Sequence, residues 1–213
     1  MKRVTFWFDP ISPFAYLAFE QLPQTLEGLS VEVTYQPLLF AGLLKHWGQK
    51  GPAEIEPKRA WTFRHVQWLA HLQGTQLDTP AQHPFNPLAL LRLLMACAPD
   101  GGTPNRFACE AVLRHAWQGG FDANDPERLA ALSAQLAPRL DPNGESVKQA
   151  VRAATERGIE LGAFGVPTVE AEGRLFWGLD GLPMLRACLQ GDAWFDGPAW
   201  SSEGAPRAGV QRS

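Results

Sequence analysis

The stretch "FDPISPFAYLAFE", residues 8–20, places the end of a strand, a turn and the start of a helix close together. Residues 4–8 are β-branched and aromatic and predict a strand. Ser12 is a favoured N-cap and Pro13 a favoured first helical residue, so a helix is expected from here to about Gly28. The turn therefore presents a serine hydroxyl, which either only caps the helix or also takes part in chemistry.

Residues 31–37, "VEVTYQP", predict a second strand because Val31, Val33 and Tyr35 alternate along it. A strand, a helix and a strand of this size most simply form a right-handed parallel crossover. Residues 4–8 and 31–37 are therefore expected to be parallel neighbours in one sheet.

From about residue 40 to 145 the sequence predicts helices only. Residues 57–74, "PKRAWTFRHVQWLAHLQG", repeat large side chains at steps of four, three and four, which is the period of an amphipathic helix. His65 falls on this apolar stripe and is expected to be a core residue. The stripe consists of Trp61, His65, Trp68 and Leu72.

Further helices are indicated by their ends. In three of them a capping residue precedes a proline, and Gly119–Gly120 is expected to end one helix. Asn143 is expected to cap a long helix that reaches Gly162 and has one apolar face. The cap–proline pairs are Asn86–Pro87, Thr103–Pro104 and Asp125–Pro126, and the apolar face is Val147, Ala150, Val151 and Ala154.

Strands return only near the end of the chain. "PTVEAEGRLFWG", residues 167–178, predicts an antiparallel hairpin around Glu172–Gly173, and "DGLPMLRACLQG" a last helix. The closing "SSEGAPRAGVQRS" is small, polar and aperiodic, and predicts a disordered tail.

This order of elements is that of a thioredoxin-like α/β fold with an inserted all-helical domain. The expected division is a discontinuous thioredoxin-like domain, a helical insertion and a tail. Their ranges are 1–39 with 146–195, then 40–145, and 196–213.

Charge and composition exclude several classes of protein. The net charge is −3 with no basic run longer than two residues, which argues against a nucleic-acid partner. The N-terminus, "MKRVTFWFDP", is too poor in apolar residues for a signal peptide, and no apolar run approaches the roughly 18 residues of a membrane span. A soluble cytoplasmic protein without a membrane partner is expected.

The cysteines and histidines show no metal or disulfide pattern. Cys97, Cys109 and Cys188 lie far apart without a CxxC pair, so three buried and reduced thiols are expected. His65 and His71 would lie on different faces of a helix, and no metal site is expected.

Three separated motifs resemble those of the 2-hydroxychromene-2-carboxylate isomerases, relatives of the kappa-class glutathione transferases in the DsbA-like group. "FDPISPFAYLA" resembles their opening "FDxxSPxSYLA", and "FGVPT", residues 164–168, their cis-proline loop. "LFWGLDGLPML", residues 175–185, resembles their glutathione-gripping segment "FWGxDxLxML". The resemblance covers roughly residues 3–190 and implies the same fold and glutathione as the cofactor.

The turn lacks the sulfur atoms of a dithiol enzyme. Ser12 and Ala15 stand where thioredoxin-fold redox enzymes carry the two cysteines of CxxC, so dithiol exchange here is impossible. The N-terminus of a helix still favours a thiolate that a ligand brings in. Ser12 is thus a candidate catalytic residue that would donate a hydrogen bond to the sulfur of glutathione without being a nucleophile.

The resemblance implies further glutathione-binding residues. A cis Pro167 would leave the main chain of Val166 free to pair with the cysteinyl backbone of glutathione. Leu179 and Asp180 would hold the γ-glutamyl end, with Trp177 close by, although Asp180 could simply cap the last helix. Lys45 and Gln49 lie where the family usually shows lysine and asparagine, "FKxTGN"; glutamine is a departure, and Lys45 could be a surface charge.

Three functions remain open. The resemblance implies a glutathione-dependent cis-trans isomerase of an aromatic or conjugated keto acid, with aromatic compound catabolism as the setting. A kappa-like glutathione transferase and a non-catalytic DsbA-like binding module are the alternatives, and the retained motifs argue against the module. Some of the eight tryptophans are candidates for lining the pocket of a flat substrate, and a homodimer is an open alternative to a monomer.

Overall fold

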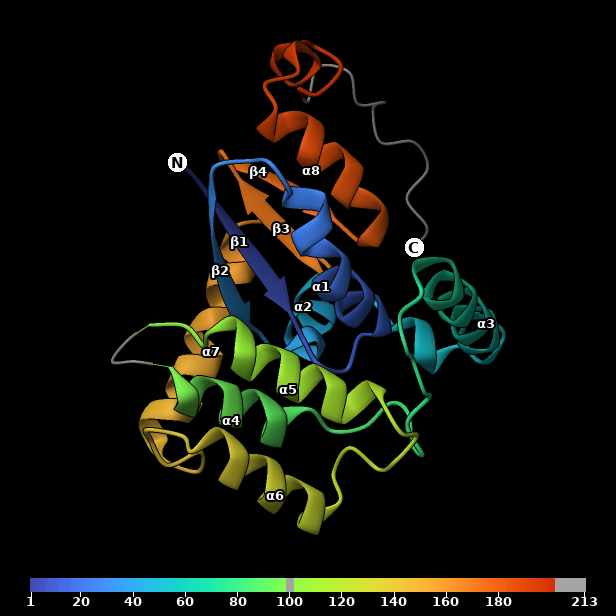
Figure 1. The fold of residues 1–213 in the computed structure, drawn as a ribbon, viewed down its shortest axis with the longest axis vertical. Coiled ribbons are helices and arrows are strands. Elements are labelled where there is room, and N and C mark those ends of the chain that lie inside the picture. The colour runs from blue at the N-terminus through green and yellow to red at the C-terminus, as the bar shows by residue number, and fades with distance from the viewer. Residues whose placement is uncertain (99–101, 202–213) are drawn as a thin grey trace.

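The computed structural model describes residues 1–98 and 102–201. A four-stranded sheet of order β2-β1-β3-β4 forms its centre (Figure 1). β1 (Lys2–Phe8) pairs parallel with β2 (Val31–Pro37) and antiparallel with β3 (Thr168–Ala171), which pairs antiparallel with β4 (Arg174–Trp177). The predicted parallel pairing of the first two strands is confirmed.

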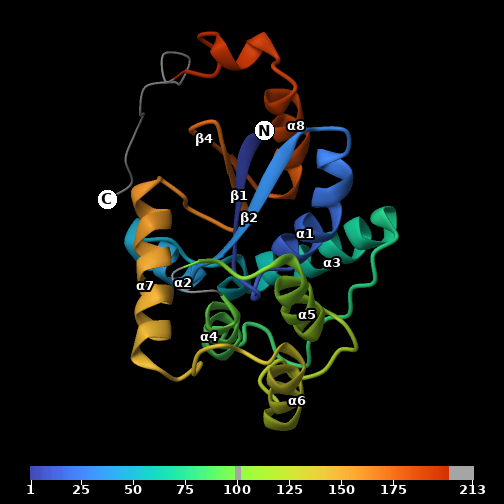
Figure 2. The same ribbon diagram turned by 60° about the vertical axis from the view of Figure 1, so that its left-hand side comes forward.

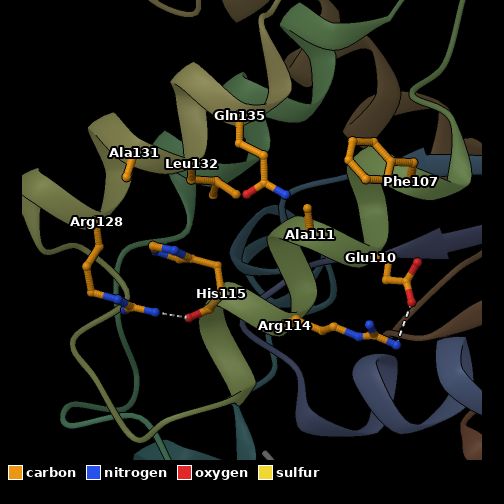
Figure 3. Close-up of a pocket in the computed structure, with 9 residues that line it drawn as sticks. All are labelled: Phe107, Glu110, Ala111, Arg114, His115, Arg128, Ala131, Leu132 and Gln135. Atoms are coloured by element: carbon orange, nitrogen blue, oxygen red, sulfur yellow. Dashed lines mark hydrogen bonds and ion pairs between the residues drawn. The ribbon is translucent and has the colours of Figure 1, made fainter.

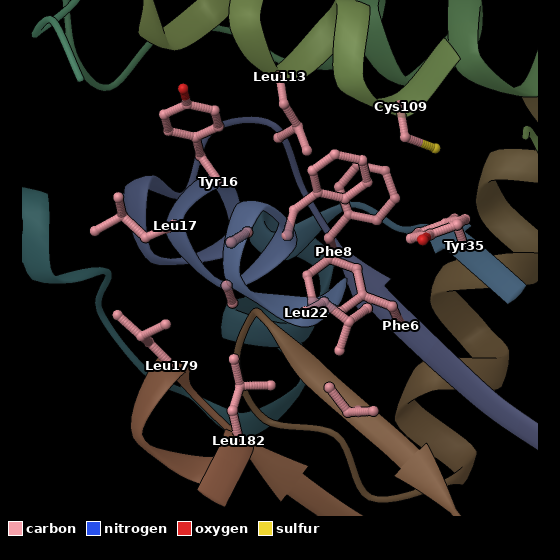
Figure 4. Packing of buried hydrophobic residues seen from close by; sticks show 14 of the residues in the cluster. Phe6, Phe8, Tyr16, Leu17, Leu22, Tyr35, Cys109, Leu113, Leu179 and Leu182 are labelled. Atoms are coloured by element: carbon pink, nitrogen blue, oxygen red, sulfur yellow. The ribbon is translucent and has the colours of Figure 1, made fainter. Parts of the chain in front are cut away.

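Helices cover both faces of the sheet. α1 (Pro13–Leu26) and α8 (Leu182–Leu189) lie on one face, and α7 (Glu145–Glu160) lies on the other (Figure 2). The side chains that α1 buries meet aromatic residues of the sheet, and Phe6, Phe19 and Tyr35 form edge-to-face and tilted ring pairs. Figure 4 shows this core between the sheet, α1 and the helical block.

Every described element between β2 and β3 is helical, as predicted. α4 (Leu88–Cys97), α5 (Arg106–Trp117) and α6 (Pro126–Leu136) lie together beyond the carboxyl end of β1. α3 (Glu56–Gln73) lies beside α1 (Figures 1 and 2). The predicted domain boundaries at 39/40 and 145/146 stay a prediction. The other longer helices of this block are α2 (Phe40–Trp47) and α7.

The predicted buried stripe of α3 is wrong. Trp61, Trp68 and Leu72 are 65%, 57% and 60% exposed, and His65 is exposed too. The helix instead buries Val66 and Ala70. The spacing of large residues identified a helix, but α3 packs against the rest of the chain through another face, where Phe63 and Leu69 are partly buried beside these two residues.

Two predicted helix ends are confirmed and a third is shifted by one residue. Asp125 Oδ1 accepts from the N–H of Arg128 at 2.9 Å and caps α6. α4 begins one residue later than predicted, since Pro87 rather than Asn86 is its N-cap, although Asn86 Oδ1 accepts from the N–H of Leu88 at 3.1 Å. Beyond α5 the chain turns at Gly119–Gly120, where φ is 85° and 69°.

Two other predicted caps are wrong. α5 begins two residues after Pro104, and Asn105 rather than Thr103 caps it by accepting from the N–H of Ala108 at 2.9 Å. Asn143 does not cap α7, because Gly144 is the N-cap and no described side chain bonds the first turn. The N–H of Asn143 donates to Asp141 Oδ1 at 2.9 Å in the turn before the helix.

The C-terminal part follows the prediction closely. Glu172 and Gly173 have φ of 52° and 73°, so a turn with left-handed residues joins β3 to β4. The predicted tail, residues 196–213, is described only to residue 201, and in that part Trp200 stacks with Phe176 at a ring-centroid distance of 5.6 Å; from residue 202 on it lies outside the described residues. Cys109 and Cys188 are buried, whereas Cys97 is only half-buried. No helix in the described ranges is long and apolar enough to cross a membrane.

Candidate functional site

Ser12 connects two distant parts of the chain. Its Oγ accepts from the N–H of Ala15 at 3.2 Å, which caps α1, and donates to the carbonyl of Val166 at 3.2 Å. The Val166–Pro167 bond is cis, so that prediction is confirmed. Ser12 is buried, with 8% of its surface exposed, and its hydroxyl lies between the N-terminus of α1 and the cis-proline loop.

The first turn of α1 has few amide donors left. The N–H of Ala15 bonds Ser12 Oγ, and the N–H of Tyr16 bonds the Ser12 carbonyl at 3.2 Å. Pro13 has no N–H. Within the described ranges the N–H of Phe14 bonds no other protein group, so it is free to bond an anion at this turn, whereas the Ser12 hydroxyl would first have to leave the Val166 carbonyl.

Asp9 lies buried beneath the turn. Its Oδ1 accepts from the N–H of Ile11 at 3.0 Å, and its Oδ2 accepts from the N–H of Phe40 at 2.9 Å, the first residue of α2. Burial raises the pKa of this carboxyl to about 7, and its two backbone hydrogen bonds oppose the shift. Asp9 therefore fixes the turn to the start of α2, a role that the sequence signals only by an acidic residue directly after a buried strand.

Two side chains of the helical block hold the carbonyls of the same turn. Trp117 Nε1 donates to the carbonyl of Pro10 at 2.8 Å, and His83 Nε2 lies 2.9 Å from the carbonyl of Ile11. A carbonyl only accepts, so Nε2 carries the proton. Burial lowers the pKa of His83. Sequence reasoning missed both residues, since neither lies in a recognisable motif.

The cis-proline loop is joined to the segment that follows β4. The N–H of Gly178 donates to the carbonyl of Pro167 at 2.9 Å. The Trp177 ring lies against Gly165 so closely that no Cβ would fit there, and its ring centroid is 5.0 Å from that of Phe164. The predicted residues Val166, Pro167 and Trp177 thus lie together.

Leu179 and Asp180 begin a short 3₁₀ helix, Leu179–Gly181, directly after this contact. Leu179 is buried in the main core, while Asp180 is exposed. The Leu179 side chain is therefore closed to a ligand, and the Asp180 carboxylate has no ion-pair partner among the described residues.

The two predicted residues near α2 lie in different places. Gln49 is exposed just beyond α2, whose Trp47 Nε1 donates to the carbonyl of Ala163 at 2.9 Å beside the cis-proline loop. Lys45 lines a groove against α7 whose lining includes none of the other predicted site residues. In the structure Lys45 thus lies on the side of α2 that faces α7, and its contact with glutathione stays a prediction.

Aromatic side chains of α3 lie beside the turn. Phe14 packs edge to face against His65 with ring centroids 5.9 Å apart, and His65 stacks with Trp61 at 6.3 Å. His65 is thus one ring of an exposed aromatic surface, contrary to its predicted place in the core.

A cavity of about 440 Å³ between α5 and α6 lies away from the predicted residues (Figure 3). Its arginines are already engaged: Arg114 pairs with Glu20 and Glu110, and Arg128 donates to the carbonyls of His115 and Asp122. The candidate site is the Ser12 turn, because there the Ser12 hydroxyl meets Val166 and the cis Pro167.

A family model described as a DSBA-like thioredoxin domain matches residues 3–190, so the chain belongs to the DsbA-like thioredoxin family. It is 28% identical over 197 residues to 2-hydroxychromene-2-carboxylate isomerase of Pseudomonas putida, covering 87% of this chain and 93% of the relative. It is 24% identical over 214 residues to glutathione S-transferase kappa 1 of Homo sapiens, covering 91% and 92%.

A solved structure of 2-hydroxychromene-2-carboxylate isomerase superposes with a TM-score of 0.74 at 22% identity, covering 94% of this chain and 100% of that chain. These comparisons confirm the predicted fold and the resemblance of the motifs. The relatives are an isomerase and a transferase, so the chain is similar to enzymes.

Proposed function

We propose that this protein is a glutathione-dependent cis-trans isomerase acting on an aromatic or conjugated keto acid. One observation carries the proposal: the Ser12 hydroxyl lies at the N-terminus of α1, hydrogen-bonded to the cis-proline loop, in a turn without cysteine. Such a turn suits a thiolate that comes with a ligand. The similarity to a glutathione S-transferase and to a 2-hydroxychromene-2-carboxylate isomerase supports both glutathione and isomerisation.

The residues present fit glutathione. The N–H of Val166 bonds no other protein group in the described part of the chain, so it is free to pair with a peptide ligand laid along the loop. The Trp177 ring flanks this loop, and Leu179 main chain and the Asp180 carboxylate would take the γ-glutamyl end, with Gln49 from beyond α2. Lys45 is not part of this proposed set.

Bound glutathione would supply a thiolate that adds reversibly to the conjugated carbon, allowing the former double bond to rotate before elimination. The role of the protein is to keep that sulfur ionised. Ser12 Oγ and the N–H of Phe14 would donate to it, and the dipole of α1 favours its charge. Asp9, His83 and Trp117 hold the turn that carries these donors.

The substrate would bind beside the aromatic surface formed by α3 and Phe14. Phe14, His65 and Trp61 offer ring faces next to the turn, as a flat conjugated substrate requires. A kappa-like transferase would use the same thiolate and release a stable conjugate, and the transferase relative keeps this alternative open. A cytoplasmic location and a homodimer stay predictions.

Activity assays with matched ligands test the proposal. The dialysed protein should convert 2-hydroxychromene-2-carboxylate to trans-hydroxybenzylidenepyruvate only when glutathione is added, without consuming glutathione. S-methylglutathione, which keeps the peptide but lacks the thiol, should bind and inhibit. Conversion that is equally fast without glutathione would contradict the proposal, and steady consumption of glutathione would favour the transferase.

A further inference from the structure

A second groove lies where α2, α4 and α7 meet, and its volume is about 520 Å³. Leu39, Leu88 and Val151 give it an apolar lining, while charged side chains come from all three helices. Four of these are positive and one is negative, a net charge of +3. They are Lys45 of α2, Arg92 of α4, and Lys148, Arg152 and Glu156 of α7.

Close packing of two helices gathers these charges. α2 approaches α7 at Gly42, where an added Cβ would lie 2.6 Å from the methyl carbon of Thr155. The N–H of Leu39 also donates to Thr155 Oγ1 at 3.0 Å. Lys45 lies about one turn after Gly42 and is therefore held over the same face of α7 that carries Lys148 and Arg152.

Three of the four positive side chains of this groove have no ionic partner within the part of the chain that the structure describes. In the described ranges, no carboxylate lies within 4.0 Å of the charged nitrogens of Lys45, Arg92 or Arg152, and Lys148 has only Glu145 at 3.9 Å. This differs from the arginines between α5 and α6, which are already engaged. Unpaired like charges around an apolar pocket repel one another and attract anions.

We propose that this groove binds a small organic dianion, with carboxylate or phosphate charges on an apolar frame. Arg92 and Arg152 are suited to bidentate recognition of such groups, whereas Lys45 and Lys148 act as point charges. Leu88 and Val151 would contact the apolar frame. The volume falls within the roughly 300–1,000 Å³ of small-molecule pockets. The site is distinct from the Ser12 turn and does not depend on the proposed isomerase activity.

Calorimetric titration of the full chain with phthalate, phenyl phosphate and benzoate tests this proposal. We expect at least one of the two dianions to bind, and benzoate with its single charge to bind more weakly. Addition of sodium chloride should weaken the binding, because screening reduces the attraction. If neither dianion binds at millimolar concentration, the proposal is wrong.

Paired variants localise the binding. Arg92→Gln/Arg152→Gln should weaken it by about tenfold or more, since two charge-assisted contacts are lost. Arg64→Gln/Arg139→Gln changes the net charge equally outside the groove and should leave the affinity unchanged. Equal weakening by both pairs would show a diffuse charge effect, and displacement of the dianion by glutathione would show that the groove is not a separate site; either result overturns the proposal.

Discussion

The Ser12 hydroxyl and the Val166 carbonyl form a hydrogen bond of 3.2 Å although 154 residues separate them in the chain. Ser12 has one proton, and without a ligand this proton lies on the Val166 carbonyl. A thiolate is a charged acceptor and would draw the hydroxyl away, because charge-assisted hydrogen bonds are the stronger ones. The freed carbonyl would then accept from a main-chain N–H of the same ligand. The hydrogen bond from Ser12 to the thiolate and the hydrogen bond from the ligand to the Val166 carbonyl would therefore favour each other.

The first prediction concerns the Ser12 hydroxyl. Ser12→Ala should raise the pKa of the glutathione thiol in the complex and lower turnover by about 10²-fold or more, because one donor to the sulfur is lost. Its cost in stability should be about 1 kcal/mol, the usual value of a helix cap. The pH titration of thiolate ultraviolet absorbance in the complex measures the pKa.

Ser12→Gly is the matched control for the capping role. Glycine caps a helix almost as well as serine but has no hydroxyl. The glycine variant should therefore be nearly as stable as wild type and yet as impaired in turnover as the alanine variant. If both variants keep the wild-type titration midpoint and activity, Ser12 is only a cap.

The second prediction concerns the buried carboxyl of Asp9. Its pKa is raised from 3.8 to about 7, so the folded protein binds a proton that the unfolded chain releases between these values. The free energy of unfolding should therefore fall as pH rises from about 4 to 7, by at most about 4 kcal/mol from this group, and level off above.

Asp9→Asn isolates this contribution. The amide cannot ionise, but only one of its two polar atoms can accept, so one of the N–H groups of Ile11 and Phe40 loses its partner. The deficit relative to wild type should be largest near pH 4 and should shrink towards pH 8, as measured by urea unfolding. Asp141→Asn, at an exposed carboxyl, should keep the wild-type pH slope; a constant deficit for Asp9→Asn would contradict the assignment.

The third prediction tests how the helical block holds the turn. Trp117→Phe removes the donor to the buried Pro10 carbonyl and should cost about 1–3 kcal/mol of unfolding free energy. Trp194→Phe is the control at a half-exposed ring and should change stability by about 0.5 kcal/mol or less. Equal effects of the two substitutions in urea unfolding would show that the Pro10 contact contributes little.

The fourth prediction concerns the contact between Gly165 and Trp177. Gly165→Ala should displace the Trp177 ring, since a Cβ does not fit beneath it, and should weaken glutathione binding measured by calorimetry. In Gly197→Ala the added Cβ meets its nearest atom at 3.4 Å, far from this loop in sequence, and affinity should be unchanged. Unaltered affinity in Gly165→Ala would remove Trp177 from the proposed site.

The sequence by itself determined the features that depend on a few neighbouring residues. Ser12 caps α1, Asp125 caps α6, and Glu172–Gly173 turns the hairpin, because each depends on backbone groups within about four residues. The parallel crossover also followed from sequence, since handedness and strand length leave one simple arrangement. The three motifs, taken together, were enough to indicate the family.

Only the tertiary structure decided which faces meet. The large side chains of α3 gave the correct helix and the wrong buried face, because periodicity alone does not say which side finds a partner. Likewise Lys45 faces α7 because Gly42 allows a close approach there. Asp9, His83 and Trp117 reach the turn through contacts that span 31, 72 and 107 residues, and such distant hydrogen bonds leave no local pattern in the sequence.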